Sequence, residues 1–161
     1  MIAFLGTGLL GTGFVRALLA KGHKVRVWNR SIGKARVLEA NGAEVFSDPS
    51  QAVHGCDRIH LALSDDGVVD AVLEQALSGL TAGAIIIDHT TTTAKGAVRR
   101  TADCAEKGFV YVHAPVFMGP ANALDGTGYM LISGDQEIVQ KLTPWLSPMT
   151  GSLLNLGDAI G

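Results

Sequence analysis

Three glycines near the start of the chain have the spacing of a turn that holds a phosphate group. Gly6, Gly8 and Gly11 form the pattern G-x-G-x-x-G between an apolar run, residues 2–5, and an amphipathic segment, residues 9–21. In such a unit the first glycine permits the tight turn, the second lets a pyrophosphate approach the backbone, and the third lets the helix pack on the strand. The start of the helix offers N–H groups and a partial positive charge. The pattern predicts a dinucleotide-binding turn, and a glycine-rich turn without a ligand is the alternative.

The end of the second apolar run, residues 25–28, bears on which dinucleotide is bound. Asn29, Arg30 and Ser31 follow it, about 20 residues after the glycine turn. Proteins that bind NAD usually place an Asp or Glu here for the ribose 2′-hydroxyl. This chain has none there, and the planar guanidinium of Arg30 can pair with a 2′-phosphate. We therefore expect NADP rather than NAD, while a solvated surface charge is the alternative for Arg30.

Two further predicted strands, residues 58–63 and 84–88, end at the same edge of the sheet. Loops at the carboxyl ends of parallel strands flank a ligand where the strand order reverses. We expect Leu63 and Ser64 along the cofactor and Thr91 near the nicotinamide ribose. The residues expected to bind the cofactor are Gly6, Thr7, Gly8, Leu9, Leu10, Gly11, Asn29, Arg30, Ser31, Leu63, Ser64, Val68, Thr90 and Thr91.

Other polar side chains are expected to have structural roles or remain open. His60 lies in an apolar strand and reads as a satisfied core residue, whereas His89 and His113 follow strands at the functional edge, where either could contact a ligand. The acidic pair at residues 65–66 reads as a helix N-cap and first turn rather than a metal site. One of the threonines at residues 92–93 is expected to cap the next helix.

Short apolar runs alternate with helical patterns along most of the chain. Strands are expected at residues 2–5, 25–28, 43–46, 58–63, 84–88 and 109–114, and helices at 9–21, 31–40, 67–76 and 93–107, with a short helix opening at 48–49. Residues 116–127 read as a loop, followed by a strand at 129–133, a helix at 136–146 and a strand at 153–156. The expected fold class is α/β, a Rossmann-like doubly wound, mainly parallel sheet with extra C-terminal strands.

Composition limits the classes of protein that fit. The chain has 161 residues, of which 47% are hydrophobic and 17% charged, enough for one domain with a buried core. A net charge of −2 lacks the basic footprint of a nucleic-acid binder. No apolar run approaches a membrane span, no signal peptide is seen, and the two cysteines are isolated. We expect a cytoplasmic protein whose partner is a small-molecule substrate, not a nucleic acid or a membrane, and no metal.

Together these motifs resemble the β-hydroxyacid dehydrogenases. That family includes 3-hydroxyisobutyrate dehydrogenase, tartronate semialdehyde reductase and 6-phosphogluconate dehydrogenase, with imine reductases as relatives. The resemblance covers nearly the whole chain and is carried by residues 4–11, 21–23, 27–31, 88–91 and 114–116, the last leading into 126–127. It implies an NADP-dependent oxidoreductase that transfers a hydride between the nicotinamide and a carbonyl or hydroxy acid.

The resemblance also implies a division of labour between two domains. In the family a C-terminal helical domain supplies an acid/base lysine with a neighbouring asparagine, and usually forms the dimer. We expect residues 1–161 to be the NAD(P)-binding domain of a longer enzyme, without a catalytic residue, inactive in isolation, and part of a homodimer. A stand-alone dinucleotide-binding module without catalysis, such as a redox sensor, is the alternative.

One motif departs from the family pattern. The family often has Ala-Pro-Val-Ser-Gly-Gly, whose serine and glycines hold the substrate carboxylate. The expected pocket wall in this chain is Pro115, Phe117, Met118 and Gly119. Phe117 has no hydroxyl to donate, and Met118 prevents the close backbone approach that glycine allows. A bulkier carbonyl or an imine substrate, as in an imine reductase, gains support, and the alternative is that Phe117 and Met118 are core residues.

Overall fold

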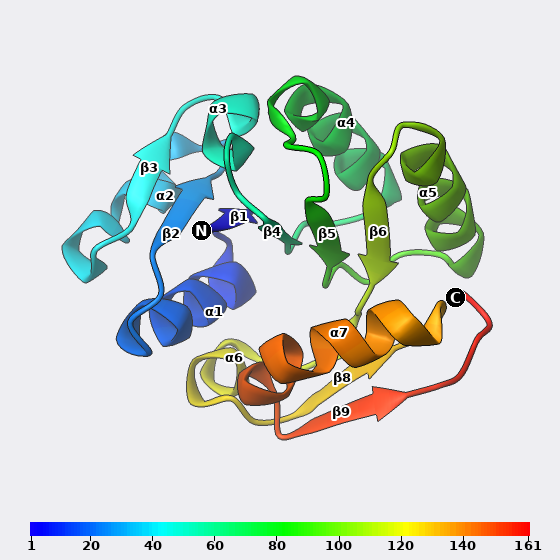
Figure 1. Ribbon diagram of the computed structural model, residues 1–161. Helices are drawn as coiled ribbons and strands as arrows, with labels where there is room; N and C mark the ends of the chain where they lie inside the picture. Colours follow the sequence, from blue (N-terminus) through cyan, green and yellow to red (C-terminus); the bar gives the residue numbers. More distant parts are fainter.

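The computed structural model describes residues 1–161, in which strands and helices alternate for most of the chain (Figure 1). The strands are β1 (Ile2–Leu5), β2 (Val25–Trp28), β3 (Glu44–Phe46), β4 (Arg58–Leu61), β5 (Ile85–Asp88), β6 (Val110–His113), β7 (Val116–Phe117), β8 (Tyr129–Ile132) and β9 (Ser152–Asn155). The helices are α1 (Leu9–Ala20), α2 (Ile32–Arg36), α3 (Pro49–Val53), α4 (Asp66–Ala76), α5 (Ala94–Glu106), α6 (Pro120–Asp125) and α7 (Gln136–Leu146).

The first six strands form one parallel sheet in the order β3-β2-β1-β4-β5-β6. The order reverses between β1 and β4, which lie side by side, so the loops that follow these two strands diverge at that edge. A second sheet, in the order β7-β8-β9, is formed by the C-terminal strands. The expected Rossmann-like fold with extra C-terminal strands is confirmed.

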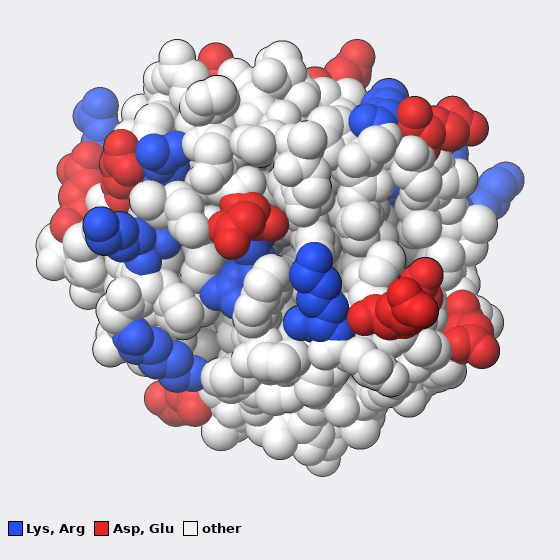
Figure 2. Space-filling view, in the orientation of Figure 1, with Lys and Arg blue, Asp and Glu red and all other residues white.

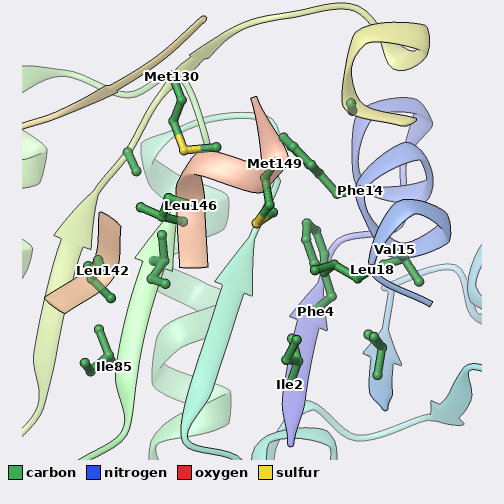
Figure 3. Close-up of a cluster of buried hydrophobic side chains, with 14 of the residues drawn as sticks. Ile2, Phe4, Phe14, Val15, Leu18, Ile85, Met130, Leu142, Leu146 and Met149 are labelled. Carbon is green, nitrogen blue, oxygen red and sulfur yellow. The ribbon is translucent and has the colours of Figure 1, made fainter. Parts of the chain in front are cut away.

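The sheet has a hydrophobic core on each face, because successive side chains of a strand point to opposite faces. In β1, Ile2 and Phe4 join the core under α1, α2 and α7, whereas Ala3 and Leu5 join the core under α3, α4 and α5. Figure 1 shows α1 and α7 on one side of the sheet and α3, α4 and α5 on the other. Figure 3 shows Met149 in the first core, beside Leu146 and the Phe4–Phe14 pair.

The helix expected at residues 31–40 is shorter than the sequence pattern indicated. Helix α2 ends at Arg36, and a 3-10 turn follows at Glu39–Asn41. The carbonyl of buried Leu38 accepts hydrogen bonds from the N–H groups of both Asn41 and Ala43, at 3.0 and 3.1 Å. The chain tightens there because it must turn back into β3 while Leu38 stays in the core.

The segment at residues 116–127 is not the loop that its composition suggested. It contains β7, which pairs antiparallel with β8, and helix α6. Pro120 opens α6, the N–H of Gly119 donates to Asn122 Oδ1 at 2.9 Å, and Gly126 ends the helix with φ of 66°. The expectation was wrong because Pro, Asn and Gly are favoured at helix ends as well as in loops.

The distribution of charged side chains, the state of the cysteines and the length of the helices complete the description of the fold. On the face shown in Figure 2, Lys and Arg side chains lie among Asp and Glu side chains over a largely uncharged surface. Both cysteines, Cys56 and Cys104, are free and buried. None of the helices is both long enough and apolar enough to cross a lipid bilayer.

The packing of α6 on α1 can be tested at Gly13. A Cβ atom there would lie 2.7 Å from the Pro120 carbonyl oxygen and 3.0 Å from Ala123 Cβ. We expect Gly13→Ala to lower the free energy of unfolding by about 1–3 kcal/mol in urea denaturation, because overpacking outweighs the gain in helix propensity. The matched control, Gly33→Ala in α2, meets open space and should be neutral or stabilising. A stabilised Gly13→Ala protein would contradict the described contact.

Candidate functional site

A cleft of about 640 Å³ lies at the carboxyl ends of the parallel strands, where the strand order reverses. Its lining comes from the loops after β1, β2, β4 and β5, from one face of α4, and from the segment after β6. The predicted cofactor residues that line it are Gly6, Gly8, Leu9, Leu10, Gly11, Asn29, Arg30, Ser31, Leu63, Ser64, Val68, Thr90 and Thr91. Thr7 is the single member of the predicted set that does not.

The three glycines of the first turn meet different constraints. Gly6 has φ of +100°, and a Cβ atom there would lie 2.3 Å from the Ala62 carbonyl oxygen. A Cβ atom at Gly11 would lie 2.0 Å from the Gly6 carbonyl oxygen and 3.3 Å from the Phe4 ring. Gly8 has φ of −67°, and a Cβ atom there would meet nothing within 4 Å. The roles predicted for Gly6 and Gly11 in the turn and in packing are confirmed, whereas the protein itself does not require glycine at position 8.

Helix α1 begins at the glycine turn without a side-chain cap. Its N-cap is Gly8, which offers no side-chain acceptor, and the first turn of the helix contains no acidic residue. The first N–H groups of any α-helix lack partners within the helix and carry a partial positive charge. Since Gly8, Leu9, Leu10 and Gly11 line the cleft, this end of α1 presents to it the N–H groups that could hold an anion.

Thr7 was expected to bind the cofactor, but it does not line the cleft. Its side chain is buried, its Oγ1 atom has no partner, and its N–H donates to Asn29 Oδ1 at 2.9 Å. The amide group of Asn29 in turn donates to the Ser31 carbonyl at 3.0 Å. Asn29 therefore joins the glycine turn to the turn after β2, and both ends of its amide are already used by the protein.

Two cationic side chains lie at the end of the cleft where the adenosine half of the cofactor is expected. Arg30 and Lys34 both line it, neither forms an ion pair, and no carboxylate is among the lining residues. Ser31, between them in the chain, has no hydrogen bond from its hydroxyl. These three side chains are free to hold a dianion.

Thr90 is fixed by every polar group that it has. Its N–H donates to Asp88 Oδ1 at 2.9 Å, its Oγ1 accepts from the Leu63 N–H at 3.0 Å, and its carbonyl accepts from His113 Nε2 at 2.9 Å. Thr91, the next residue, is exposed and makes no side-chain hydrogen bond. Thr90 therefore joins the loops after β4 and β5, and Thr91 is left available to a ligand.

A partly buried network of hydrogen bonds and ion pairs lies behind Thr90. The Tyr111 hydroxyl donates to Asp88 at 2.6 Å and accepts from Arg100 Nε at 3.0 Å, while the Arg100 guanidinium contacts Asp66 at 2.7 Å and Asp70 at 3.0 Å. Burial, together with the Asp88 carboxylate, raises the pKa of Tyr111. Burial opposes the charge of Arg100, but hydrogen bonds from the guanidinium to Asp66 and Asp70 outweigh it and raise the pKa. The network ties α4 and α5 to the floor of the cleft.

The predicted helix caps are confirmed. Asp65 is the N-cap of α4 and accepts from the Val68 N–H at 3.0 Å, and Ser64 Oγ donates to Asp65 at 2.8 Å. Thr93 is the N-cap of α5 and accepts from the Gly96 N–H at 3.0 Å. The hydroxyl of Ser64 is thus already engaged at the cleft wall.

Two histidines form a buried pair below the glycine turn. His89 Nδ1 lies 2.9 Å from the Ala114 carbonyl oxygen, which can only accept, so this nitrogen carries the proton. His89 Nε2 is then the acceptor for His60 Nδ1, at 2.8 Å, and His60 Nε2 is left as a buried acceptor without a partner. Burial lowers the pKa of His89 to about 4 and that of His60 well below its usual value, so both rings are neutral. His60 is a core residue, as expected, but only half satisfied, and His89 lines the cleft.

The predicted substrate wall is divided between two cavities. Met118 lines the main cleft, and Pro115 and Phe117 line a neighbouring cavity of about 230 Å³. Gly119 lines neither cavity and is instead the N-cap of α6. Phe117 is 69% exposed, so a core role is wrong for it, whereas Met118 packs partly against the first core.

Comparison with known proteins agrees with this geometry. The sequence profile described as the NAD binding domain of 6-phosphogluconate dehydrogenase matches residues 1–157. The chain belongs to this family.

Several relatives of this NAD-binding domain are longer proteins named as oxidoreductases. It is 33% identical to the 3-sulfolactaldehyde reductase of Escherichia coli K12 over 97% of this chain and 53% of that protein. The structure of Mycobacterium tuberculosis 3-hydroxyisobutyrate dehydrogenase with L-serine is 28% identical, covering 98% of this chain and 54% of that one, with a TM-score of 0.93. The structure of a Streptomyces aurantiacus imine reductase is 26% identical, covering 99% of this chain and 56% of that one, with a TM-score of 0.91. The domain spans about half the length of the curated relatives that it matches.

Sequence reasoning missed several residues of the cleft of this NAD-binding domain. Lys34 lies in α2, directly after the Asn29–Ser31 turn, and its closeness in sequence to Arg30 could have indicated it. Gly67, Ala71 and Gln75 recur at every fourth position along one face of α4. The contribution of His60 to the cleft, through His89, has no sequence signal, because 29 residues separate the two histidines.

The neutral histidine pair predicts a pH-dependent stability for the NAD-binding domain. The unfolded chain gains protons on these side chains below their usual pKa of 6.5, whereas in the folded chain the pKa of His89 is about 4 and that of His60 is also well below its usual value. The free energy of unfolding should therefore be full above pH 6.5 and fall with decreasing pH, by up to about 1.4 kcal/mol per pH unit for each histidine. Urea denaturation at pH 7 and pH 5 measures this, above the range in which carboxylates titrate. The His60→Phe, His89→Asn double variant should show a flatter profile, and an equally steep one would contradict the assignment.

Proposed function

We propose that the cleft binds NADP(H) and that the protein is an NADP-dependent oxidoreductase of the β-hydroxyacid dehydrogenase type. The observation that carries this proposal is Gly8. Backbone conformation and packing explain glycine at positions 6 and 11, but neither explains it at position 8, where a side chain would project into open space beside the end of α1. A pyrophosphate held against the backbone at that point accounts for the missing side chain.

The choice of NADP over NAD rests on the charges at the end of β2. Arg30 and Lys34 offer two unpaired cations, Ser31 offers a free hydroxyl, and no carboxylate lines the cleft to repel a phosphate. A ribose 2′-phosphate would be held there by charge-assisted hydrogen bonds, for which the Arg30 guanidinium has the fitting planar geometry. Val68, Ala71 and other residues of the α4 face would provide the apolar surface beside the adenosine.

The opposite end of the cleft would receive the nicotinamide. The bound cofactor would supply a hydride to, or accept one from, a carbonyl or alcohol carbon. Thr91 offers a hydroxyl there, and Val116 and Met118 offer an apolar wall that excludes water. No lysine or carboxylate lines this end, and His89 is neutral with both ring nitrogens in use. The proton donor of the reaction is therefore not among the residues that line this end, so we expect residues 1–161 to bind cofactor without turnover.

Two apolar side chains favour a second reaction class. Met118 at the cleft and exposed Phe117 beside it stand where a hydroxy-acid enzyme would present hydrogen-bond donors. An imine or a bulky carbonyl compound needs no carboxylate pocket and would suit this wall. Comparison of cyclic imines with small hydroxy acids as substrates of the full-length protein distinguishes the two classes.

The pyrophosphate site is tested by Gly8→Ala. Because the new methyl group meets no protein atom, we expect stability in urea denaturation to fall by no more than about 1 kcal/mol, the preference of an N-cap for Gly over Ala, but NADPH binding to weaken about tenfold or more in fluorescence titration. Gly33→Ala, at the other glycine that has both open space and no positive φ, should leave NADPH affinity unchanged and stability unchanged or slightly raised. Unaltered NADPH affinity in Gly8→Ala would remove the main support for the proposal.

Cofactor choice is tested by Arg30→Ala and Lys34→Ala. Each removes a charged donor from the proposed 2′-phosphate site, so NADPH should bind roughly tenfold to a hundredfold more weakly, while NADH affinity changes little. Arg36→Ala is the control, since Arg36 lies in α2, the helix that contains Lys34, but outside the cleft. Equal affinity of the unaltered chain for NADH and NADPH would refute the preference for NADP.

A further inference from the structure

His89 stands where strands β5 and β6 separate. The Ala114 N–H donates to the Asp88 carbonyl at 2.7 Å as the last bond of this kind in the ladder. In a parallel ladder the next bond would run from the Thr90 N–H to the Ala114 carbonyl. The Thr90 N–H is instead bound by the Asp88 side chain, and the His89 imidazole donates to the Ala114 carbonyl at 2.9 Å. A side chain has therefore taken the place of a backbone donor at the point where the cleft begins.

This substitution connects the two walls at the nicotinamide end. Thr90 and Thr91 follow His89 in one wall, and Val116 and Met118 follow Ala114 in the other. We propose that His89, oriented by His60, is a positioning residue for the nicotinamide half of the cofactor: it sets the separation between these walls. This inference rests on the proposed function, since it assumes that a nicotinamide dinucleotide occupies the cleft.

The histidine pair is rigid enough to set a separation. His60 is completely buried and His89 is 1% exposed. The His60 ring stacks on Phe4 at 5.5 Å between centroids, and the His89 ring lies 5.2 Å from that of Phe14. His60 Nδ1 donates to His89 Nε2, which leaves His89 one orientation in which both of its ring nitrogens are satisfied. Rotation of the ring by half a turn would break both bonds and leave the polar groups of this pair without their partners.

The polar character of the histidine pair distinguishes a positioning role from simple packing. An apolar pair of similar volume would fill the same space without two buried polar rings, one of which keeps an unpartnered nitrogen. The only hydrogen bond that the two imidazole rings make to the backbone is the one to the Ala114 carbonyl. The role of the pair should therefore appear in the geometry of the segment after Ala114 more than in core stability.

The test separates the two halves of the cofactor in the 161-residue chain. 2′,5′-ADP reports the adenosine half alone, and NADPH reports both halves, with its nicotinamide fluorescence as a direct signal of ring environment. His89→Leu removes the donor to Ala114. We expect NADPH to bind about fivefold to tenfold more weakly, with lower fluorescence enhancement, while the affinity for 2′,5′-ADP is unchanged.

Two companion variants identify the bond responsible. Asn places an amide N–H near the position of imidazole Nδ1, so His89→Asn should restore NADPH affinity and fluorescence toward those of the unaltered chain. His60→Phe keeps the stacking on Phe4 but removes the donor to His89, and it should give a smaller loss confined to the nicotinamide half. Val139→Ala, in the core under α7, is the stability control and should change neither ligand affinity.

The outcomes distinguish this inference from the proposed function. If the unaltered chain binds neither NADPH nor NADH, the proposed function fails. If it binds NADPH and a folded His89→Leu variant binds both ligands as well as it does, or loses both equally, the positioning role is wrong. Should His89→Leu not fold, His60→Phe decides, because wild-type NADPH affinity and fluorescence in that variant would overturn the inference.

Discussion

Contact between backbones at the end of β1 is the constraint on which the cleft depends. The Gly6 Cα approaches the Ala62 carbonyl, and the Gly11 Cα approaches the Gly6 carbonyl, so closely that a methyl group at either position would overlap an oxygen atom. These contacts bring the glycine turn, the start of α1 and the end of β4 together at the reversal of strand order. The unpaired N–H groups of α1 are thereby aimed at the cleft, and every other lining element is arranged around that point.

The polar groups around the cleft divide into those that build it and those that remain free. Buried polar groups need partners, and Asn29, Thr90 and His89 use theirs to join one loop to another. Arg30 and Thr91 make no such contacts and lie at opposite ends of the lining. A list of polar residues at strand ends therefore overstates the number that can bind a ligand. The structure shows which of them have hydrogen-bonding capacity left.

Local patterns predicted what depends on local structure. Short apolar runs located all six strands of the main sheet, and Gly6 and Gly11 fulfil backbone roles that their spacing implied. The predictions failed where contacts between segments distant in sequence determine the structure. The inward turn of Thr7 depends on Asn29, 22 residues away, and α6 is held by a close contact with Gly13 across the first core. Neither contact leaves a periodic signal in the sequence, so composition alone gave a loop at residues 116–127.

The second sheet explains why the substrate wall and the core cannot vary independently. Between β6 and β7 only two residues intervene, and the carbonyl of Pro115 accepts from the Leu131 N–H in β8 at 2.9 Å. The chain therefore leaves the cleft already bound to the sheet that covers one face of the first core. Met118 lines the cleft, packs against that core, and leaves no room for a side chain at Gly128, where a Cβ atom would lie 2.9 Å from it. A smaller residue at Met118 would widen the cleft and loosen this packing together, so the apolar wall is part of the fold as well as of the site.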